Sequence, residues 1–288
     1  MSVHDQMLYD WSRVAVPADN AQRGRLAMLF DGIQIGVNRG IEVAPLDRPA
    51  MRKPRHRVLY LDRASREDLQ HKYSDPALAG RVIPENVEDI DIVWDGTQPL
   101  AEVTRLRNFD FCISSRAVQL LPDLVGWLAQ IGTLLRQGSV VNMAIPHRDY
   151  TFDHLRALTR PAELIQAYLE NRKRPSGGQV FDHVANAAQL GSKTAPLRPA
   201  VIREAFEHAW AVTHGNHHMD VHCSVFTPQS FLECFEVLSY TGMINLKLRN
   251  IWPQTVRGDE FVVSMEFGGF PLEEMASSFR DGRAAALA

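Results

Sequence analysis

Two short apolar runs, each followed by a turn, constrain the fold of this chain more than any other feature. The first covers residues 40–43 and the second residues 58–61, with a polar, basic segment between them. Such runs are typical of neighbouring parallel strands, whose carboxyl ends form one crevice where open α/β sheets bind ligands. Asp62 follows the second run, and its carboxylate offers two oxygens to the hydroxyl groups of a ribose. We therefore expect a crevice for a nucleotide-type ligand.

The turn after the first run contains Ala44 and Pro45 where nucleotide-binding loops usually carry glycine. Glycine is favoured there because the backbone has to approach the ligand closely. We therefore expect the crevice to be either narrower than usual or empty. Glu42, just before this turn, either holds the turn itself or binds an ammonium group of the ligand.

Composition excludes several classes of function. The chain has 288 residues, of which 31 are basic and 34 acidic, and its formal charge is -3. A mildly acidic chain produces no overall field that attracts nucleic acid, and the basic run at residues 52–57 has no interleaved aromatic side chains. No apolar run reaches the ~20 residues of a membrane span, and three cysteines cannot form a disulfide framework. We expect a cytoplasmic protein with no nucleic-acid partner and no membrane span.

Strand-like and helix-like patterns alternate along the chain. Apolar alternation predicts strands over residues 89–94, 109–114 and 139–146. Ser65 as an N-cap, with acids in the first turn and bases in the last, predicts a helix over residues 65–72. Apolar residues at helical spacing predict a second helix over residues 120–135. This order predicts an α/β fold with a doubly wound, mostly parallel sheet.

The second half of the chain has a different pattern. Polar helices broken by proline and glycine predict an insertion over the ligand-binding edge of the sheet. Thr227 and Pro228 begin a further helix, and the strand candidates at residues 244–248 and 260–267 should be antiparallel because no helix separates them. The expected parts are a helical segment (1–39), a cofactor-binding core (40–150), a helical insertion or lid (151–220), the end of the core (221–270) and a tail that frays from Ala284 (271–288).

Several motifs resemble a known family. Residues 40–49 are similar to G-L-E-I-G-P-L-x-x-P, and residues 58–62 to V-x-Y-V-D. Residues 145–153 resemble I-P-D-K-R-F-T-F-D, and residues 226–231 resemble F-T-P-E-S-F. These patterns are those of the class I S-adenosylmethionine-dependent methyltransferases, specifically a bacterial group of the type 11 methyltransferase domain often encoded among surface-polysaccharide genes. The resemblance implies a seven-stranded Rossmann-like sheet with the helical insertion after the fifth strand.

The resemblance also implies a cofactor, S-adenosylmethionine, and a set of residues that bind it: Glu42, Ala44, Asp62, Asp95, Ser114 and Arg116. The family usually carries S-H-V-I-E-H where this chain has residues 115–120, so two histidines and a glutamate are absent. Two functions follow. The first is methyl transfer to an oxygen or nitrogen of a small-molecule or carbohydrate substrate, and we favour it. The alternative is a catalytically inactive relative that serves as a binding or assembly subunit.

Two histidines are candidates for a general base. His147 follows the strand that ends at Pro146, and an imidazole near its unperturbed pKa can remove a proton from the acceptor. We expect the carboxylate of Asp220 to orient the imidazole of His222 over the mouth of the substrate site, so that His222 is the second candidate base. The alternative for each histidine is a solvated loop residue. Arg148, Tyr150 and Arg156 are the expected substrate-binding residues.

The remaining candidates concern metals and partners. A cluster of potential zinc ligands has poor spacing, so we expect no metal site. Its members are His214, His217, His218, Asp220, His222 and Cys223. Tyr9 and Trp11 favour a helix that packs either on the crevice or on a second copy of the chain. The sequence does not decide between these two, so a homo-oligomer is one of the expected alternatives.

Overall fold

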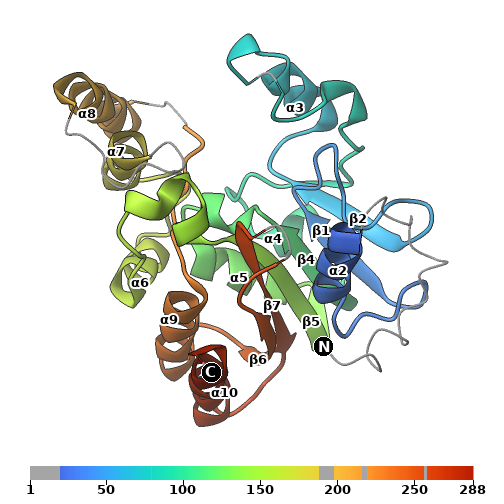
Figure 1. Ribbon diagram of the computed structural model, residues 1–288. Helices are drawn as coiled ribbons and strands as arrows, with labels where there is room; N and C mark the ends of the chain where they lie inside the picture. Colours follow the sequence, from blue (N-terminus) through green and yellow to red (C-terminus); the bar gives the residue numbers. More distant parts are fainter. Residues whose placement is uncertain (1–19, 79, 188–197, 216–218, 256–257, 288) are drawn as a thin grey trace.

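A seven-stranded sheet organises the computed structural model of this protein (Figure 1). The structure describes residues 20–78, 80–187, 198–215, 219–255 and 258–287, so Tyr9, Trp11, His217 and His218 lie outside the described residues. The strand order is β3-β2-β1-β4-β5-β7-β6. The strands are β1 (Arg39–Val43), β2 (Arg57–Asp62), β3 (Ile92–Val93), β4 (Phe109–Ser115), β5 (Leu135–Pro146), β6 (Leu246–Trp252) and β7 (Glu260–Phe267).

Strand direction follows the sequence-based prediction. Strands β1 to β5 are parallel to one another, with Val43 beside Leu61 in β2 and beside Ser114 in β4. Strand β7 inserts antiparallel between β5 and β6, and β6 pairs antiparallel with β7. The carboxyl ends of β1, β2, β3 and β4 therefore meet at one edge of the sheet, as predicted. A doubly wound, mostly parallel sheet is confirmed.

Helices cover both faces of the sheet. Helix α2 packs on the face that carries Tyr60 and Phe111, whereas α5, α9 and α10 cover the face that carries Ile41 and Cys112. The helices are α2 (Asn20–Leu29), α3 (Arg66–Tyr73), α4 (Leu100–Val103), α5 (Leu124–Gly132), α6 (Pro161–Leu169), α7 (Gly177–Asn186), α8 (Pro199–His214), α9 (Pro228–Tyr240) and α10 (Leu272–Leu287). No helix in the described segments is long and apolar enough to cross a membrane.

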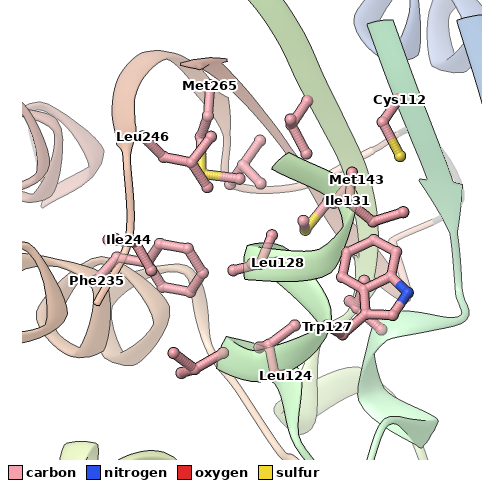
Figure 2. Packing of buried hydrophobic residues seen from close by; sticks show 14 of the residues in the cluster. Cys112, Leu124, Trp127, Leu128, Ile131, Met143, Phe235, Ile244, Leu246 and Met265 are labelled. Atoms are coloured by element: carbon pink, nitrogen blue, oxygen red, sulfur yellow. The ribbon is translucent and has the colours of Figure 1, made fainter. Parts of the chain in front are cut away.

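The larger core cluster lies between the sheet and α5, α9 and α10. Figure 2 shows Trp127 and Leu128 of α5 among side chains of the sheet and of α9. In β4, Phe111 and Ile113 face α2, while Cys112 between them faces the opposite cluster. This alternation buries the strand on both faces, which explains why its sequence is apolar almost throughout.

Two predicted elements need correction. The helix expected over residues 120–135 spans only Leu124–Gly132, because Asp123 caps its start by accepting a hydrogen bond from the Gly126 backbone. Strand β5 already begins at Leu135, where it pairs with Phe109, and Gly138 takes a positive φ of 77° inside the strand. Gly138 therefore accommodates an irregularity in the strand.

The predicted C-terminal tail is instead helix α10. Met275, Ala276 and Phe279 are buried, and α10 packs on α9 and β6. The spacing of these apolar residues matches one face of a helix, so the sequence contained the signal.

The segment between β5 and α9 holds helices α6, α7 and α8. Figure 1 shows α7 and α8 projecting beyond the sheet on the side away from α3. Asp220, near the end of this segment, forms ion pairs with Lys72 of α3 and with Arg63, whose Nη1 lies 3.6 Å from Asp220 Oδ1. The segment is thereby tied to the opposite side of the carboxyl edge.

Candidate functional site

A cavity of about 1070 Å³ lies at the carboxyl edge of the sheet. Its walls come from the ends of β1, β2 and β4, from the start of α5 and from the segment after β5. Pockets for small ligands commonly measure about 300–1,000 Å³, so this cavity can take a ligand the size of a dinucleotide or a nucleoside with a second molecule. The crevice is open, so the structure does not support the expected narrowing; whether the crevice binds a ligand stays a prediction.

Glu42 holds the first turn. Its side chain is 1 % exposed, and its oxygens accept hydrogen bonds from the backbone of Ala50 (2.6 Å) and Met51 (2.9 Å). Burial raises the pKa of Glu42 to about 7, although these two hydrogen bonds and the charge of Arg25 act in the opposite direction. Of the two roles open to this residue, holding the turn is therefore the one that the structure supports.

Ala44 occupies a backbone conformation that favours glycine. Its φ is 51°, and its backbone N–H donates to the carbonyl of Leu61 at 2.8 Å. A left-handed conformation costs an L-residue about 1–2 kcal/mol, so the turn keeps a glycine-like shape without glycine. Ala44 lines the cavity without closing it.

Asp62 ends β2 and lines the cavity. Its side chain is 6 % exposed, and Oδ1 accepts the backbone N–H of Arg63 at 2.7 Å. Burial raises the pKa of Asp62, while backbone hydrogen bonds from Arg63 and Ala64 and the charge of Lys72 oppose that rise. A carboxylate has about four lone-pair positions, so this one retains capacity for hydroxyl groups in the cavity.

The predicted residues of β3 and β4 are only partly in the cavity. Asp95 lines it and accepts hydrogen bonds from the Thr97 backbone (2.9 Å) and hydroxyl (2.7 Å), which lower the pKa of Asp95. Ser114 is fully buried and does not line the cavity, whereas its neighbour Ser115 does. Side chains alternate along a strand, so the prediction was shifted by one residue.

Arg116 lines the cavity in a left-handed conformation, with a φ of 56°. Its Nη1 lies 2.9 Å from Asp259 Oδ2 and 3.7 Å from Glu260 Oε2. The guanidinium group is thus held against the start of β7 and leaves the cavity open.

Arg25 is a cavity residue that sequence reasoning missed. It belongs to α2, lines the cavity, and pairs with Glu260, with Nη2 lying 3.1 Å from Oε2. The same Nη2 donates to Ser115 Oγ at 2.6 Å. An arginine in an otherwise ordinary helix gives no local signal of such a contact.

His147 does not line the cavity. It is 8 % exposed, and its ring lies 4.7 Å from the Tyr150 ring and edge-on to Phe261. Its Nδ1 accepts the backbone N–H of Asp149 at 3.2 Å. Burial lowers the pKa of His147, with a partial opposite effect of Asp149. The imidazole therefore packs in the protein, away from the cavity walls.

The predicted pairing of Asp220 with His222 is wrong. His222 Nδ1 lies 2.5 Å from Oδ2 of Asp153, whereas Asp220 pairs with Lys72 and Arg63. Burial alone would raise the pKa of Asp153, but the hydrogen bonds and charges of His222 and Arg156 lower it below its usual range. Asp220 lines the cavity and His222 does not.

Arg156 ties together residues of the segment between β5 and α9, at the place that we call the lid base. Its side chain is 2 % exposed and donates to Asp153 (2.8 Å), to Asp182 (2.7 Å) and to the carbonyl of His222 (2.9 Å). Burial and the charge of Arg156 lower the pKa of the adjacent His183 to about 4. We call Asp153, Arg156, Asp182, His183 and His222 the lid-base cluster.

The other predicted substrate residues also lie outside the cavity lining. Arg148 Nε donates to the Arg156 carbonyl at 2.9 Å, and Tyr150 is half exposed beside His147. The segment between β5 and α9 instead contributes Tyr168, Arg172 and Lys173 to the cavity. In the described part of the chain, no three His, Cys, Asp or Glu side chains are grouped to hold a metal ion.

Comparisons with known proteins give remote structural likenesses. No family model matches the chain, and no curated protein matches its sequence. Among solved structures, one described as a Zn-dependent alcohol dehydrogenase from Rhodobacter sphaeroides is 13% identical, with 92% of this chain and 97% of that chain covered and a TM-score of 0.49. An S-adenosylmethionine-dependent methyltransferase from Mesorhizobium loti is 14% identical (85% and 97% covered, TM-score 0.42). One from Clostridium acetobutylicum is 7% identical (93% and 100% covered, TM-score 0.44).

The strand order defines the class of fold independently of these likenesses. A sheet of order β3-β2-β1-β4-β5-β7-β6 with only β7 reversed is the Rossmann-like fold of the class I methyltransferases. The predicted fold class is therefore confirmed.

Proposed function

We propose that this protein is an S-adenosylmethionine-dependent methyltransferase that acts on an oxygen or nitrogen of a small-molecule or carbohydrate substrate. One observation carries the proposal: the sheet places Asp62 and the Glu42–Ala44 turn side by side in the wall of an open cavity of about 1070 Å³. A carboxylate at the end of β2 suits the ribose hydroxyls of an adenosyl group. The left-handed Ala44 keeps the turn shaped for close approach of the ligand.

When bound, S-adenosylmethionine supplies a methyl group whose bond to sulfur breaks as a bond to the acceptor atom forms, with the acceptor's proton released. The protein's part is to bind, align and exclude water. Asp62 would hold the ribose hydroxyls, and Asp95, in the loop after β3, would contact the adenine side. Tyr168 and Lys173 of the proposed lid would shield the cavity from solvent. The predicted imidazole bases do not line the cavity, so alignment is the main contribution that its walls offer.

Calorimetry with S-adenosylhomocysteine tests this proposal. We expect micromolar binding that weakens about 10- to 100-fold in Asp62→Asn, because an ionised acceptor of hydroxyl hydrogen bonds becomes neutral. Asp89→Asn is the matched control, since the Asp89 side chain is 83 % exposed and pairs with Arg66 at the surface. Absence of heat with both S-adenosylhomocysteine and S-adenosylmethionine would contradict the proposal.

The second candidate function is a binding or assembly subunit that has kept the fold and lost the chemistry. It is favoured by Arg116, which stands where the family pattern has histidine, and by the distance of His147 and His222 from the cavity lining. Equilibrium binding separates the candidates, because an abandoned pocket gives no thermal shift with either ligand.

A further inference from the structure

Basic side chains of the cavity lining reach solvent on both sides of the cavity, whereas the acids at the sheet are buried. We call four of these side chains the basic arc: Arg63, Lys72, Arg81 and Lys173. Asp62 at the end of β2 and Asp123 at the start of α5 line the same cavity and are buried. A ligand that occupies the cavity therefore meets acids at the sheet and accessible cations further out.

The middle of the basic arc is built around Asp220. Arg63 Nη1 lies 3.6 Å from Asp220 Oδ1, and Lys72 forms an ion pair with the same carboxylate. Lys72 Nζ also lies 5.3 Å from the centre of the Tyr73 ring. These contacts join α3 to the segment between β5 and α9, so the middle of the arc is paired within the protein.

Arg81 forms one end of the arc, beside Tyr73. Burial raises the pKa of Tyr73, and the nearby charge of Arg81 opposes that rise. The Arg81 side chain is exposed, and it forms no ion pair with any residue that the structure describes. Its guanidinium group therefore has donors to offer to a ligand.

Lys173 forms the other end, across the loop after β3. A Cβ added to Gly96 would lie 3.9 Å from Lys173 Cδ, so the stem of the lysine passes over this loop. Hydrogen bonds from Thr97 lower the pKa of Asp95 in the same loop, and the charge of Arg63 lowers it further. Lys173 thus continues the arc beyond Arg63. It is exposed and, within the described part of the chain, has no ion pair.

The cofactor does not match the two ends of the arc. Asp123 offsets part of the charge of Lys173, because burial raises the pKa of Asp123 and Lys173 opposes that rise, but its Oδ1 already caps α5. S-adenosylmethionine has a positive sulfonium and no phosphate, so it supplies no counter-charge of that kind. A cavity of about 1070 Å³ has room for a second molecule beside a nucleoside. The second molecule is therefore expected to be the anion.

A phosphate suits the arc better than a carboxylate does. A phosphate ester carries about −1.5 to −2 charges at neutral pH and has three acceptor oxygens. Arginine binds phosphate through parallel N–H donors, and lysine binds it as a compact charge. Because the cations follow one another along the arc, an anion with several charged oxygens can contact more than one of them.

We propose that the basic arc binds a phosphate or diphosphate group of the methyl acceptor, with Arg81 and Lys173 as its main donors. This inference rests on the proposed function, since it assigns the outer part of the cavity to the second substrate. It narrows the acceptor to a phosphate-bearing molecule. Arg81 and Lys173 belong to none of the motifs that carry the family resemblance.

Calorimetry with inorganic pyrophosphate tests the arc in protein saturated with S-adenosylhomocysteine. We expect pyrophosphate to bind alongside S-adenosylhomocysteine, and Arg81→Gln and Lys173→Gln each to weaken it about five- to tenfold through loss of a charged donor. Acetate, with one charge, should bind at least about tenfold more weakly than pyrophosphate. Arg160→Gln is the control, because it removes the same charge from the segment that holds Lys173, at a side chain that is 75 % exposed and outside the cavity lining.

Two further ligands distinguish the source of the phosphate. Binding of glucose 6-phosphate, with glucose as the neutral comparison, indicates a soluble ester. Co-sedimentation with phosphatidate vesicles, and not with phosphatidylcholine vesicles, indicates a lipid headgroup. Either result supports the proposal, because both ligands present the same group, and loss of either in Lys173→Gln assigns it to the arc. Protein that takes pyrophosphate and neither ester overturns the assignment to an acceptor.

The failures of the two proposals differ. Protein that binds S-adenosylhomocysteine, but whose pyrophosphate is displaced by it or binds equally well to the arc variants, overturns the phosphate site and leaves the proposed function intact. Protein that binds neither S-adenosylhomocysteine nor S-adenosylmethionine overturns the proposed function, and the acceptor site with it.

Discussion

The cavity wall and the lid-base cluster are both rich in charged side chains, yet they use them differently. In the lid-base cluster, Arg156 donates to two carboxylates and a carbonyl and is 2 % exposed. In the cavity wall, Asp62, Arg116 and Asp259 each have protein partners but also face an open volume. The first set holds the protein together, and the second can meet a ligand.

This difference shows why reactive residue types alone are a poor guide to a site. The Asp153–His222 pair has the composition of a catalytic dyad, but its neighbours are Arg156 and His183 of the protein itself. Asp62 is an ordinary aspartate, and it is a candidate binding residue because it lies at the end of β2 in the cavity wall. Access to the cavity, and not chemical type, separates the two regions.

The largest expected effect concerns the lid-base cluster. Arg156→Ala should lower the free energy of unfolding by about 3–5 kcal/mol, because it leaves the buried Asp153 without its guanidinium partner and removes the cation shared with the partly exposed Asp182. Urea unfolding measures this. Arg160→Ala is the control, since its pair with Glu163 is exposed and should contribute less than about 1 kcal/mol. A stable Arg156→Ala protein that has lost ligand affinity would place Arg156 in the binding site and break the comparison.

The second effect is a pH dependence that differs between the regions. The pKa of Glu42 rises from 4.5 to about 7, so the folded state gains a proton that the unfolded state has lost between these values. The contribution of Glu42 to the free energy of unfolding is therefore complete below about pH 4.5 and is lost as the pH rises through about 7. At about 1.4 kcal/mol per pKa unit, the loss amounts to about 3 kcal/mol. Asp153 has a lowered pKa and acts in the opposite direction at lower pH.

Urea unfolding at a series of pH values checks the Glu42 contribution. Glu42→Gln should flatten the decline of stability between pH 5 and pH 7, whereas the exposed Glu67→Gln should leave the slope as it is in the wild type. An unchanged slope in Glu42→Gln would mean that Glu42 is ionised throughout this range in the folded protein.

The smallest effect concerns the turn. Ala44→Gly should stabilise the protein by up to about 1 kcal/mol, because the left-handed φ of 51° is strained for alanine and the gain exceeds the extra chain entropy of glycine. Ala129→Gly, in helix α5, should destabilise by about 1 kcal/mol. Thermal unfolding of both variants checks the opposite signs, and destabilisation by Ala44→Gly would contradict the strain.

Much of the fold could be predicted because its signals are local. Apolar alternation located β4 and β7, the Ser65 cap located α3, and Thr227 with Pro228 located α9. The boundary between α5 and β5 was missed because the apolar run through Leu134 and Leu135 fits a helix as well as a strand. Leu135 belongs to the strand because it pairs with Phe109 of β4, and the sequence does not show this pairing.

The site was only partly predictable. Six predicted residues line the cavity because they lie at or just after the ends of strands, or near the end of the segment between β5 and α9: Glu42, Ala44, Asp62, Asp95, Arg116 and Asp220. Their place follows from sheet topology, which sequence patterns reveal. The partners of Arg25 and of His222 depend on packing between distant segments, and no local pattern specifies them.

The Arg25–Glu260 contact joins residues 235 positions apart. Because one end of the cavity wall comes from the first described helix and the other from the last strand, the wall is complete only after nearly the whole chain has been synthesised and has folded. Long-range contacts of this kind form late and slowly. Ligand affinity is consequently a sensitive gauge of whether a preparation of this protein has reached its native state along its entire length.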